Sequence, residues 1–402
     1  MEKNNRSAFL VIFLTIFIDL LGFGIIIPLL PDFLKNVLME KESVIGIAVG
    51  IFSLMQFIFT PIWGSLSDIY GRKPILIMSL ACNTISYVLM ALVITGVFPS
   101  LTLLILSRAL AGIFSANLSA AQSVVSDLTT KENRSKGMGY MGAAFGLGFV
   151  FGPAMGGFFS YKFGYGVPLI MSACFSFIAM TLCVLVFKES LHSELMAENK
   201  RNFSGVRLIN FRAVHDVLSN KKVGIFVIIF FFITFSFANI HATFLLFAEK
   251  KDGLNLNQEE VGLLFSFIGI VAAIVQGTLI KFFKDKVGEE KSLVIGNIFT
   301  GIGLALIPFA VNVPILLIFL LFLAFGNGLN NPMVLGLISQ NVGQEEQGSV
   351  LGINQALGSL ARFFGPVWGG FVFQNLGFQF PFFSGGLFML LITIFSLRIL
   401  KK

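Results

Sequence analysis

The chain has 402 residues, of which 56% are hydrophobic and only 12% are charged. These values lie far outside the range of soluble globular domains and predict a polytopic membrane protein. The net charge of +7 does not predict a nucleic-acid partner, because membrane topology accounts for the basic residues. The three cysteines lie in apolar segments without metal-ligand spacing, so no metal site is expected: Cys82, Cys174 and Cys183.

The first apolar segment, Ala8–Leu30, contains a single carboxylate, Asp19. The nearest charges are Arg6 and Asp32, each thirteen residues away, or roughly 20 Å along a helix. An ionisable group near the membrane midplane costs about 2.5 to 3.5 kcal/mol and normally faces a bundle interior or a water-filled path. Asp19 is therefore the first candidate for a functional residue. The segment does not fit a cleavable signal peptide and is expected to be retained.

Eleven further apolar stretches of roughly 20 residues follow, each long enough to span a bilayer. The twelve predicted segments are Ala8–Leu30, Val44–Ser65, Ile75–Gly96, Leu101–Val125, Gly137–Phe159, Val167–Phe187, Gly224–Phe247, Glu260–Ile280, Leu293–Val311, Ile315–Gln340, Gly348–Phe373 and Pro381–Leu400.

Basic residues are distributed unequally between the two sides of these segments. If the segments alternate from an internal amino terminus, 21 of the 28 Lys and Arg residues fall on the inner side and five on the outer side. Positive charge concentrates on the cytoplasmic side of membrane proteins. The sequence thus predicts that both termini are cytoplasmic. Arg108 and Arg362 remain within the membrane.

One long polar connection, Lys188–Lys222, divides the segments six and six. We therefore expect an amino-terminal bundle (1–187), a cytoplasmic linker (188–222) and a carboxy-terminal bundle (223–402). A shift of 213 residues places the Gly-Pro-x-x-Gly-Gly sequence of residues 152–157 on the same pattern at 365–370, which indicates duplication. The predicted fold is an all-α membrane protein with twelve transmembrane helices in two pseudo-symmetric six-helix bundles, in parallel orientation.

Residues 64–73 read Gly-Ser-Leu-Ser-Asp-Ile-Tyr-Gly-Arg-Lys and follow the second segment. The glycines permit a tight turn and close helix approach. The sequence resembles the loop signature between helices 2 and 3 of the major facilitator superfamily. In that family the loop latches the two halves on the cytoplasmic side. The resemblance implies gating roles for Gly64, Asp68, Gly71, Arg72 and Lys73.

The fourth segment presents one polar face, because its polar and small residues recur every three or four positions. Arg108, Gly112 and Gln122 belong to this face, which is expected to line a cavity. The depth of Arg108 would let its guanidinium reach Asp19. An Arg-x-x-x-Gly element in the fourth helix of the same family is linked to proton coupling, and Arg108 and Gly112 match it.

The fifth segment combines closely spaced glycines with a proline inside a helix. It resembles the family's antiporter signature, which marks exporters that exchange substrate for protons. The matching residues are Gly148, Gly152, Pro153, Gly156 and Gly157. With the first-segment sequence around Asp19, the chain most resembles twelve-helix drug and proton antiporters of the tetracycline efflux branch. In the second half the gating loop is degraded, since Lys281 stands where Asp68 would repeat.

Polar residues of the membrane segments are the remaining candidates for substrate binding. Intramembrane amides either face a polar cavity or form interhelical hydrogen bonds, and both alternatives stay open. For His241 a structural role also stays open. Arg362 could meet carbonyls, water or an anionic substrate group. The candidates are Gln122, Asn239, His241, Asn327, Asn330, Asn331, Gln355 and Arg362.

The sequence contains no nucleotide-binding loop and no nucleophilic triad, so we expect neither an enzyme nor ATP-driven transport. The favoured function is proton-coupled efflux of small amphipathic compounds by alternating access in a bacterial cytoplasmic membrane. The proton gradient would replace any cofactor, and one chain could act as a monomer. The alternative is a uniporter, importer or flippase for an endogenous metabolite or lipid. A receptor or scaffold that transports nothing would leave the polar helix faces unexplained.

Overall fold

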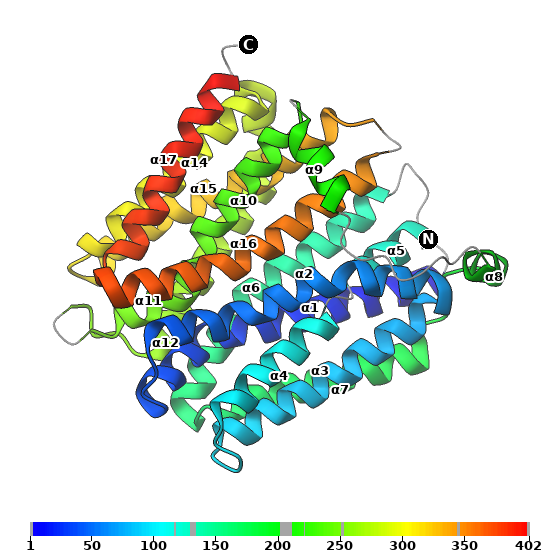
Figure 1. Ribbon diagram of the computed structural model, residues 1–402, viewed down its shortest axis with the longest axis horizontal. Helices are drawn as coiled ribbons and strands as arrows, with labels where there is room; N and C mark the ends of the chain where they lie inside the picture. Colours follow the sequence, from blue (N-terminus) through cyan, green and yellow to red (C-terminus); the bar gives the residue numbers. More distant parts are fainter. Residues whose placement is uncertain are drawn as a thin grey trace. The chain divides into compact units, whose positions relative to one another are not determined.

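The computed structural model describes residues 3–115, 118–128, 134–201, 211–220, 222–250, 253–343 and 346–399, and these residues form helices and no strands. Figure 1 shows the long helices that make up the molecule. Within the described residues, all twelve predicted apolar segments are helical over most of their length. The first six correspond to α1 (Lys3–Asp32), α2 (Glu42–Tyr70), α3 (Arg72–Ile94), α4 (Leu101–Phe114) with α5 (Leu118–Leu128), α6 (Arg134–Phe163) and α7 (Gly166–Val186).

The last six segments follow two short helices of the central region, α8 (Ser193–Arg201) and α9 (Phe211–Ser219). Short π-helical or 3-10 turns, labelled η, extend several of them. The elements are α10 (Gly224–Ala238) with α11 (Ile240–Ala248), α12 (Gln258–Ile274) with η3 (Val275–Leu279), α13 (Ile280–Phe282) and η4 (Phe283–Val287), α14 (Glu289–Leu306) with η5 (Ile307–Phe309), α15 (Val313–Gln340), α16 (Gln347–Leu376) and α17 (Phe380–Ile399). In the first half, η1 (Phe33–Val37) prolongs α1.

Ten helices of the described chain are long and apolar enough to cross a membrane. The other two predicted segments are the fourth and the eleventh. The fourth is covered by the shorter helices α4 and α5. The eleventh is α16, whose 30 residues are long enough to span but include Asn354, Gln355 and Arg362, which lower its hydropathy.

The chain divides into two compact units by its contacts. The first unit comprises residues 1–26 and 51–209, and the second comprises residues 27–50 and 210–402. Helices α1 and α2 therefore each contribute residues to both units. The predicted boundaries at 187 and 222 stay predictions.

The first unit has a core built from the inner faces of α1, α3, α5, α6 and α7. Ile12, Leu80, Val124 and Cys183 are among its buried members, and each is at most 2% exposed. The opposite face of α7 carries exposed apolar side chains, such as Leu185 at 75%. A helix with apolar residues on both faces is expected where lipid covers one of them.

In the second unit α14 packs against both α15 and α17, which run beside it in Figure 1. Glycines let these helices approach closely: a Cβ at Gly303 would lie 2.8 Å from the Cα of Leu323 on α15. The first residues of α2 also belong to this unit. A Cβ at Gly50 would lie 2.8 Å from the carbonyl oxygen of Phe363 on α16.

Equivalent contacts occur in the two halves, as the predicted duplication requires. Gly152 of α6 packs against Gly24 of α1, and Gly365 of α16 packs against Ala238 of α10. The turns that precede α3 and α14 also match. Gly71 precedes α3 with φ +96°, and Gly288 precedes α14 with φ +90°, a left-handed conformation that glycine adopts without strain.

Candidate functional site

Asp19 is half-buried in the first unit and lies beside a polar residue of α3. The side-chain amide of Asn83 donates a hydrogen bond of 2.8 Å to Asp19 Oδ1 and another of 3.0 Å to Ser115 Oγ. Asn83 is completely buried. An amide donor held at a carboxylate stabilises its ionised form. The side chains of α1, α3 and the end of α4 thus form one connected polar path.

Tyr87 lies one helical turn beyond Asn83, and its hydroxyl lies against Gly22 of α1. The ring is 2% exposed. The phenol lies within electrostatic reach of both Asp19 and Arg108. Gly22 has no side chain, which is the reason that the phenol fits there: a Cβ would collide with the Tyr87 hydroxyl. Asn83 and Tyr87 were both missing from the sequence prediction, although each is a polar residue in an apolar segment.

Arg108 of α4 is fully buried, and its guanidinium carbon lies 4.9 Å from the centre of the Phe52 ring. This distance permits a cation–π contact, which is strongest away from water. Gly112, one turn further, packs against the backbone of Phe52. The Arg-x-x-x-Gly spacing therefore lets α4 approach α2 and places the guanidinium on the Phe52 ring. The predicted pairing of Arg108 with Asp19 stays a prediction.

The glycines of the predicted antiporter signature pack α6 against the stretch of α1 that follows Asp19. Gly148 lies against Leu20, Gly152 against Gly24 and Gly156 against Ile25. The ring of Pro153 also lies beside Gly24, and Gly157 is buried. A side chain at any of the first three positions would press on α1, because a Cβ there meets its atoms at less than 3.0 Å.

The predicted gating residues form a charged network at one end of the first unit. Arg72 Nη1 lies 2.6 Å from Asp68 Oδ1, and Arg72 Nε lies 3.3 Å from Asp127 Oδ2. Arg72 is 5% exposed. A buried guanidinium needs such partners. The carbonyl oxygen of Gly64 accepts a hydrogen bond from Ser67, whose hydroxyl also accepts one from Arg72.

Glu189, just after α7, completes this network. Its carboxylate accepts hydrogen bonds from the backbone amides of Arg72 (2.9 Å) and Lys73 (3.0 Å) at the start of α3. These amides have no partner within their helix, and the helix dipole favours a negative charge there. Asp127 and Glu189 were not predicted from the sequence, because they lie 55 and 117 residues from Arg72.

Several substrate candidates form hydrogen bonds between helices. Asn239 donates to the carbonyl oxygen of Pro381 at 2.6 Å, and Asn330 donates to Thr300 at 3.1 Å. Asn331 donates to Asn327 on its own helix at 3.4 Å. The bonds of Asn239 and Asn330 correspond to the interhelical alternative considered for the amides. A substrate-binding role for these residues, as for Gln122 and Gln355, stays a prediction.

His241 and Arg362 both belong to the second unit. His241 is 4% exposed, and its ring meets the Phe237 ring edge to face at 5.6 Å. Arg362 is half-buried and donates a hydrogen bond of 2.9 Å to Ser359. Among the described residues, no carboxylate forms an ion pair with this guanidinium. Asn354, on the same helix, is 0% exposed, and neither atom of its amide has a hydrogen-bond partner among the described residues.

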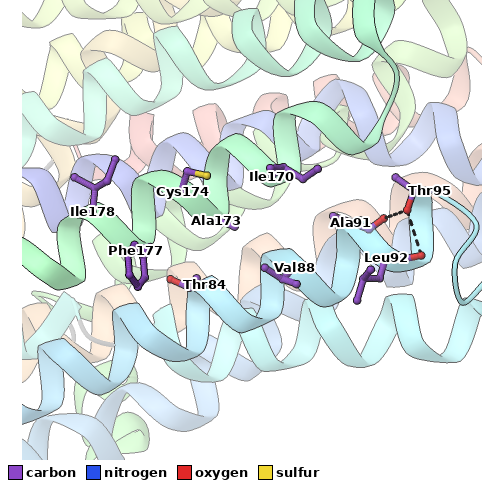
Figure 2. A pocket seen from close by; sticks show the side chains of 10 residues that line it. All are labelled: Thr84, Val88, Ala91, Leu92, Thr95, Ile170, Ala173, Cys174, Phe177 and Ile178. Atoms are coloured by element: carbon purple, nitrogen blue, oxygen red, sulfur yellow. Dashed lines mark hydrogen bonds between the residues drawn. The ribbon is translucent and has the colours of Figure 1, made fainter.

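A groove of about 570 Å³ lies between α3 and α7 of the first unit. Figure 2 shows the side chains that line it, including Val88 and Leu92 from α3 and Phe177 and Ile178 from α7. Phe177 and Ile178 are more than half exposed, as expected for a face toward lipid. None of the predicted site residues lines this groove. Within the part of the chain that the structure describes, no three His, Cys, Asp or Glu residues could hold a metal ion.

Comparison with known proteins places this arrangement in a family. The profile described as Major Facilitator Superfamily matches residues 12–284 and 242–402. Multidrug resistance protein 2 of Bacillus subtilis (strain 168) is 30% identical over 397 residues, which cover 96% of this chain and 94% of that protein. The class E tetracycline resistance protein of Escherichia coli is 31% identical and covers 92% of this chain and 88% of its own length.

Solved structures show the same fold. The human organic anion transporter MFSD10 superposes with a TM-score of 0.70 at 23% identity, covering 98% of this chain and 99% of its own. The nucleoside transporter NupG superposes with a TM-score of 0.77 at 13% identity, covering both chains completely. The chain therefore belongs to the major facilitator superfamily, and it is a membrane transporter and not an enzyme.

Proposed function

We propose that the protein is a proton-coupled antiporter that exports small amphipathic compounds by alternating access. The observation that carries this proposal is the half-buried carboxylate of Asp19, which is hydrogen-bonded to Asn83 and followed directly by the contacts of α1 with the α6 glycines. The similar proteins support export, since they include multidrug and tetracycline resistance proteins.

The chemistry of Asp19 suits proton coupling. The ionised carboxylate accepts the Asn83 amide, whereas desolvation favours the protonated form. A movement of α1 relative to α3 would change both effects and with them the proton affinity of Asp19. Each proton entering the cell supplies about 2.3 kcal/mol per 100 mV of membrane potential and about 1.4 kcal/mol per pH unit. No cofactor is required for this cycle.

The network at the start of α3 is proposed to act as the cytoplasmic gate. Arg72 is held by Asp68 and Asp127, and Glu189 holds the backbone of the same helix turn. This arrangement fixes the Arg72 side chain. The Lys73 side chain donates a hydrogen bond to the carbonyl oxygen of Val184. We place this end on the cytoplasmic side of a bacterial inner membrane because the basic loops lie there, with both termini inside.

The test replaces Asp19 by Asn in the full chain reconstituted into vesicles with an imposed pH gradient, with tetracycline as the transported probe. Asp19→Asn is expected to abolish gradient-driven movement and to retain substrate exchange without a gradient, because only the proton-carrying step is removed. Asp285→Asn, which changes an exposed carboxylate, is the matched control. Gradient-driven transport by Asp19→Asn at the native rate would refute the coupling role.

A second candidate function is the transport of an anionic metabolite or lipid by uniport, import or flipping. Two observations favour it: Arg362 has no carboxylate partner among the described residues, and a protein of the same fold is named an organic anion transporter. Here Arg362→Ala would abolish transport of an organic anion, Arg362→Lys would retain part of it, and an imposed pH gradient would not affect the rate.

A further inference from the structure

Two carboxyl groups lie together in the second unit, at the end that the charge distribution places outside the cell. Asp32 is the last residue of α1, and Glu249 directly follows α11. Two amide side chains accompany them, Asn36 from η1 and Gln258 from the start of α12. The cluster joins segments that are more than 200 residues apart in the sequence.

The amides connect the two carboxyl groups. Asn36 Nδ2 donates to Asp32 Oδ1 at 2.6 Å and reaches Glu249 Oε2 at 3.5 Å. Gln258 donates to the other oxygen of Asp32. Asp32 is only 2% exposed. One amide side chain thus reaches both carboxyl groups, so the two groups lie close to each other.

Two ionised carboxylates cannot bond to each other, because an ionised carboxylate can only accept hydrogen bonds. Like charges sharing a desolvated site also favour retention of one proton. Burial, followed by the hydrogen bond to Asp32 and its charge, raises the pKa of Glu249 to about 9, although the Asn36 amide acts in the opposite direction.

The basic residues nearest in sequence are engaged with other groups. Lys35 forms an ion pair of 2.6 Å with Glu42, and Lys250 Nζ lies 3.5 Å from the centre of the Phe378 ring. The first turn of α12 adds two acidic residues, Glu259 and Glu260. Glu260 is part of the capping box of its helix. Lys251 and Asp252 lie outside the described residues.

The other contacts that hold this segment are uncharged. Gly46 and Gly50 of α2 pack against the backbone of Pro366 and Phe363 on α16, and Gly370 packs against the backbone of Glu42. The backbone amide of Ser43 donates to Gln374 at 3.3 Å. None of these contacts gains or loses a proton near neutral pH, so the carboxyl pair is the part of this arrangement that responds to pH.

We propose that Glu249 keeps its proton beside Asp32 and that the two side chains form a pH-sensitive latch that fastens the ends of α1 and η1 to α11 and α12. Loss of the proton leaves two carboxylates in one desolvated cluster, and their repulsion favours separation of these ends. The latch is distinct from the coupling carboxylate Asp19. The test of the latch measures protonation and distance, not transport. The latch can therefore be refuted while the proposed function stands, and the proposed function can be refuted while the latch stands.

The direction of the pH effect follows from the raised pKa of Glu249. A group with a raised pKa stabilises the latched arrangement fully below its ordinary pKa of 4.5, and this stabilisation is lost as the pH rises through about 9. One proton changes the ratio of latched to separated molecules about tenfold per pH unit within this window. Between pH 5.5 and 8.5 the ratio falls by a factor of about 1000.

The experiment uses the full chain in lipid nanodiscs. An infrared titration records protonated carboxyl groups, and spin labels at Met39→Cys and Gly253→Cys record the distance between the two ends in a background with the native cysteines replaced by alanine. Met39 and Gly253 are both exposed. We expect a protonated carboxyl group at pH 7 that titrates above pH 8, and a short distance at pH 5.5 that gives way to a longer one at pH 8.5.

The variants separate the latch from other carboxylates. Glu249→Gln and Asp32→Asn each keep a hydrogen-bonding group and remove the like-charge repulsion, so both should keep the short distance at every pH. Glu249→Gln should also lose the infrared signal, whereas in Asp32→Asn the signal should titrate at a lower pH, because Glu249 stays buried without its acidic neighbour. Glu40→Gln, in the neighbouring loop, should behave as the native chain. The latch is refuted if the Glu249→Gln signal equals the native signal at pH 7, or if both variants and the native chain show the same distances throughout the titration.

Discussion

Alanine substitutions of the α6 glycines are expected to change the free energy of unfolding in opposite directions. The reason is that some of these glycines are crowded by neighbouring atoms and others have open space around them. We consider Gly152→Ala and Gly146→Ala. A Cβ at Gly152 would lie 2.8 Å from the Cα of Gly24 and 2.8 Å from the carbonyl oxygen of Leu21. A Cβ at Gly146 would meet nothing within 4 Å. Both residues lie in the interior of the same helix.

The two substitutions change the free energy of unfolding in opposite directions. At Gly152 the added methyl group presses on backbone atoms that cannot rotate away, so α6 and α1 must move apart, which costs about 1 to 3 kcal/mol. At Gly146 the substitution removes backbone freedom from the unfolded chain and improves helix propensity, which stabilises by about 0.4 to 1 kcal/mol. The two variants should differ by roughly 1.4 to 4 kcal/mol.

The assay is thermal unfolding of the purified variants in one detergent, followed by proton-driven transport in vesicles. We expect the unfolding midpoint of Gly152→Ala below that of the native chain and the midpoint of Gly146→Ala at or above it. The rate of transport should fall for Gly152→Ala but not for Gly146→Ala. The reason is that only Gly152 lies against α1, the helix that carries Asp19. Equal shifts of both midpoints would show that contact with α1 does not decide the effect and would refute the packing argument.

Three further variants test single contacts. Glu189→Ala removes the carboxylate that accepts hydrogen bonds from two backbone amides of α3. In a denaturation series it should lower the free energy of unfolding by about 1 to 3 kcal/mol, whereas the control Glu194→Ala, at an exposed residue, should cause no change. Asn354→Leu removes a buried amide without a partner among the described residues and should raise the unfolding midpoint; a lower midpoint would indicate a hidden partner. Asn83→Leu deletes the hydrogen bond to Asp19 and should lower the rate of proton-driven transport; a native rate would remove Asn83 from the site.

The helices could be predicted from the sequence because each depends on a local property. A run of about 20 apolar residues is sufficient to identify a membrane span, and the twelve predicted segments are all helical. The glycine pattern also predicted where helices approach closely, as at Gly152 and Gly365. The duplication was recognisable because the same sequence recurs at a fixed spacing.

The partners within the site depend on distant parts of the chain and could not be predicted in this way. Asp127 and Glu189 meet Arg72 only because α5 and the end of α7 reach the start of α3. Asn83 is one amide in an apolar segment, and nothing in the local sequence distinguishes it from an interhelical hydrogen-bonding residue. Glu249 lies in a polar loop, where a carboxylate is ordinary, and only its proximity to Asp32 gives it a distinct chemistry.

The duplicated halves use the same packing for different chemistry. Gly152 and Gly365 occupy equivalent contacts, each closing one long helix onto the first helix of its half. The polar groups beside these contacts differ, because Asp19 accompanies the first, whereas Asn239 packs against Gly369 next to the second. A carboxylate can carry a proton and an amide cannot. We therefore infer that proton transfer belongs to the first half, and that the second half, with its amides and Arg362, contributes recognition of the transported compound.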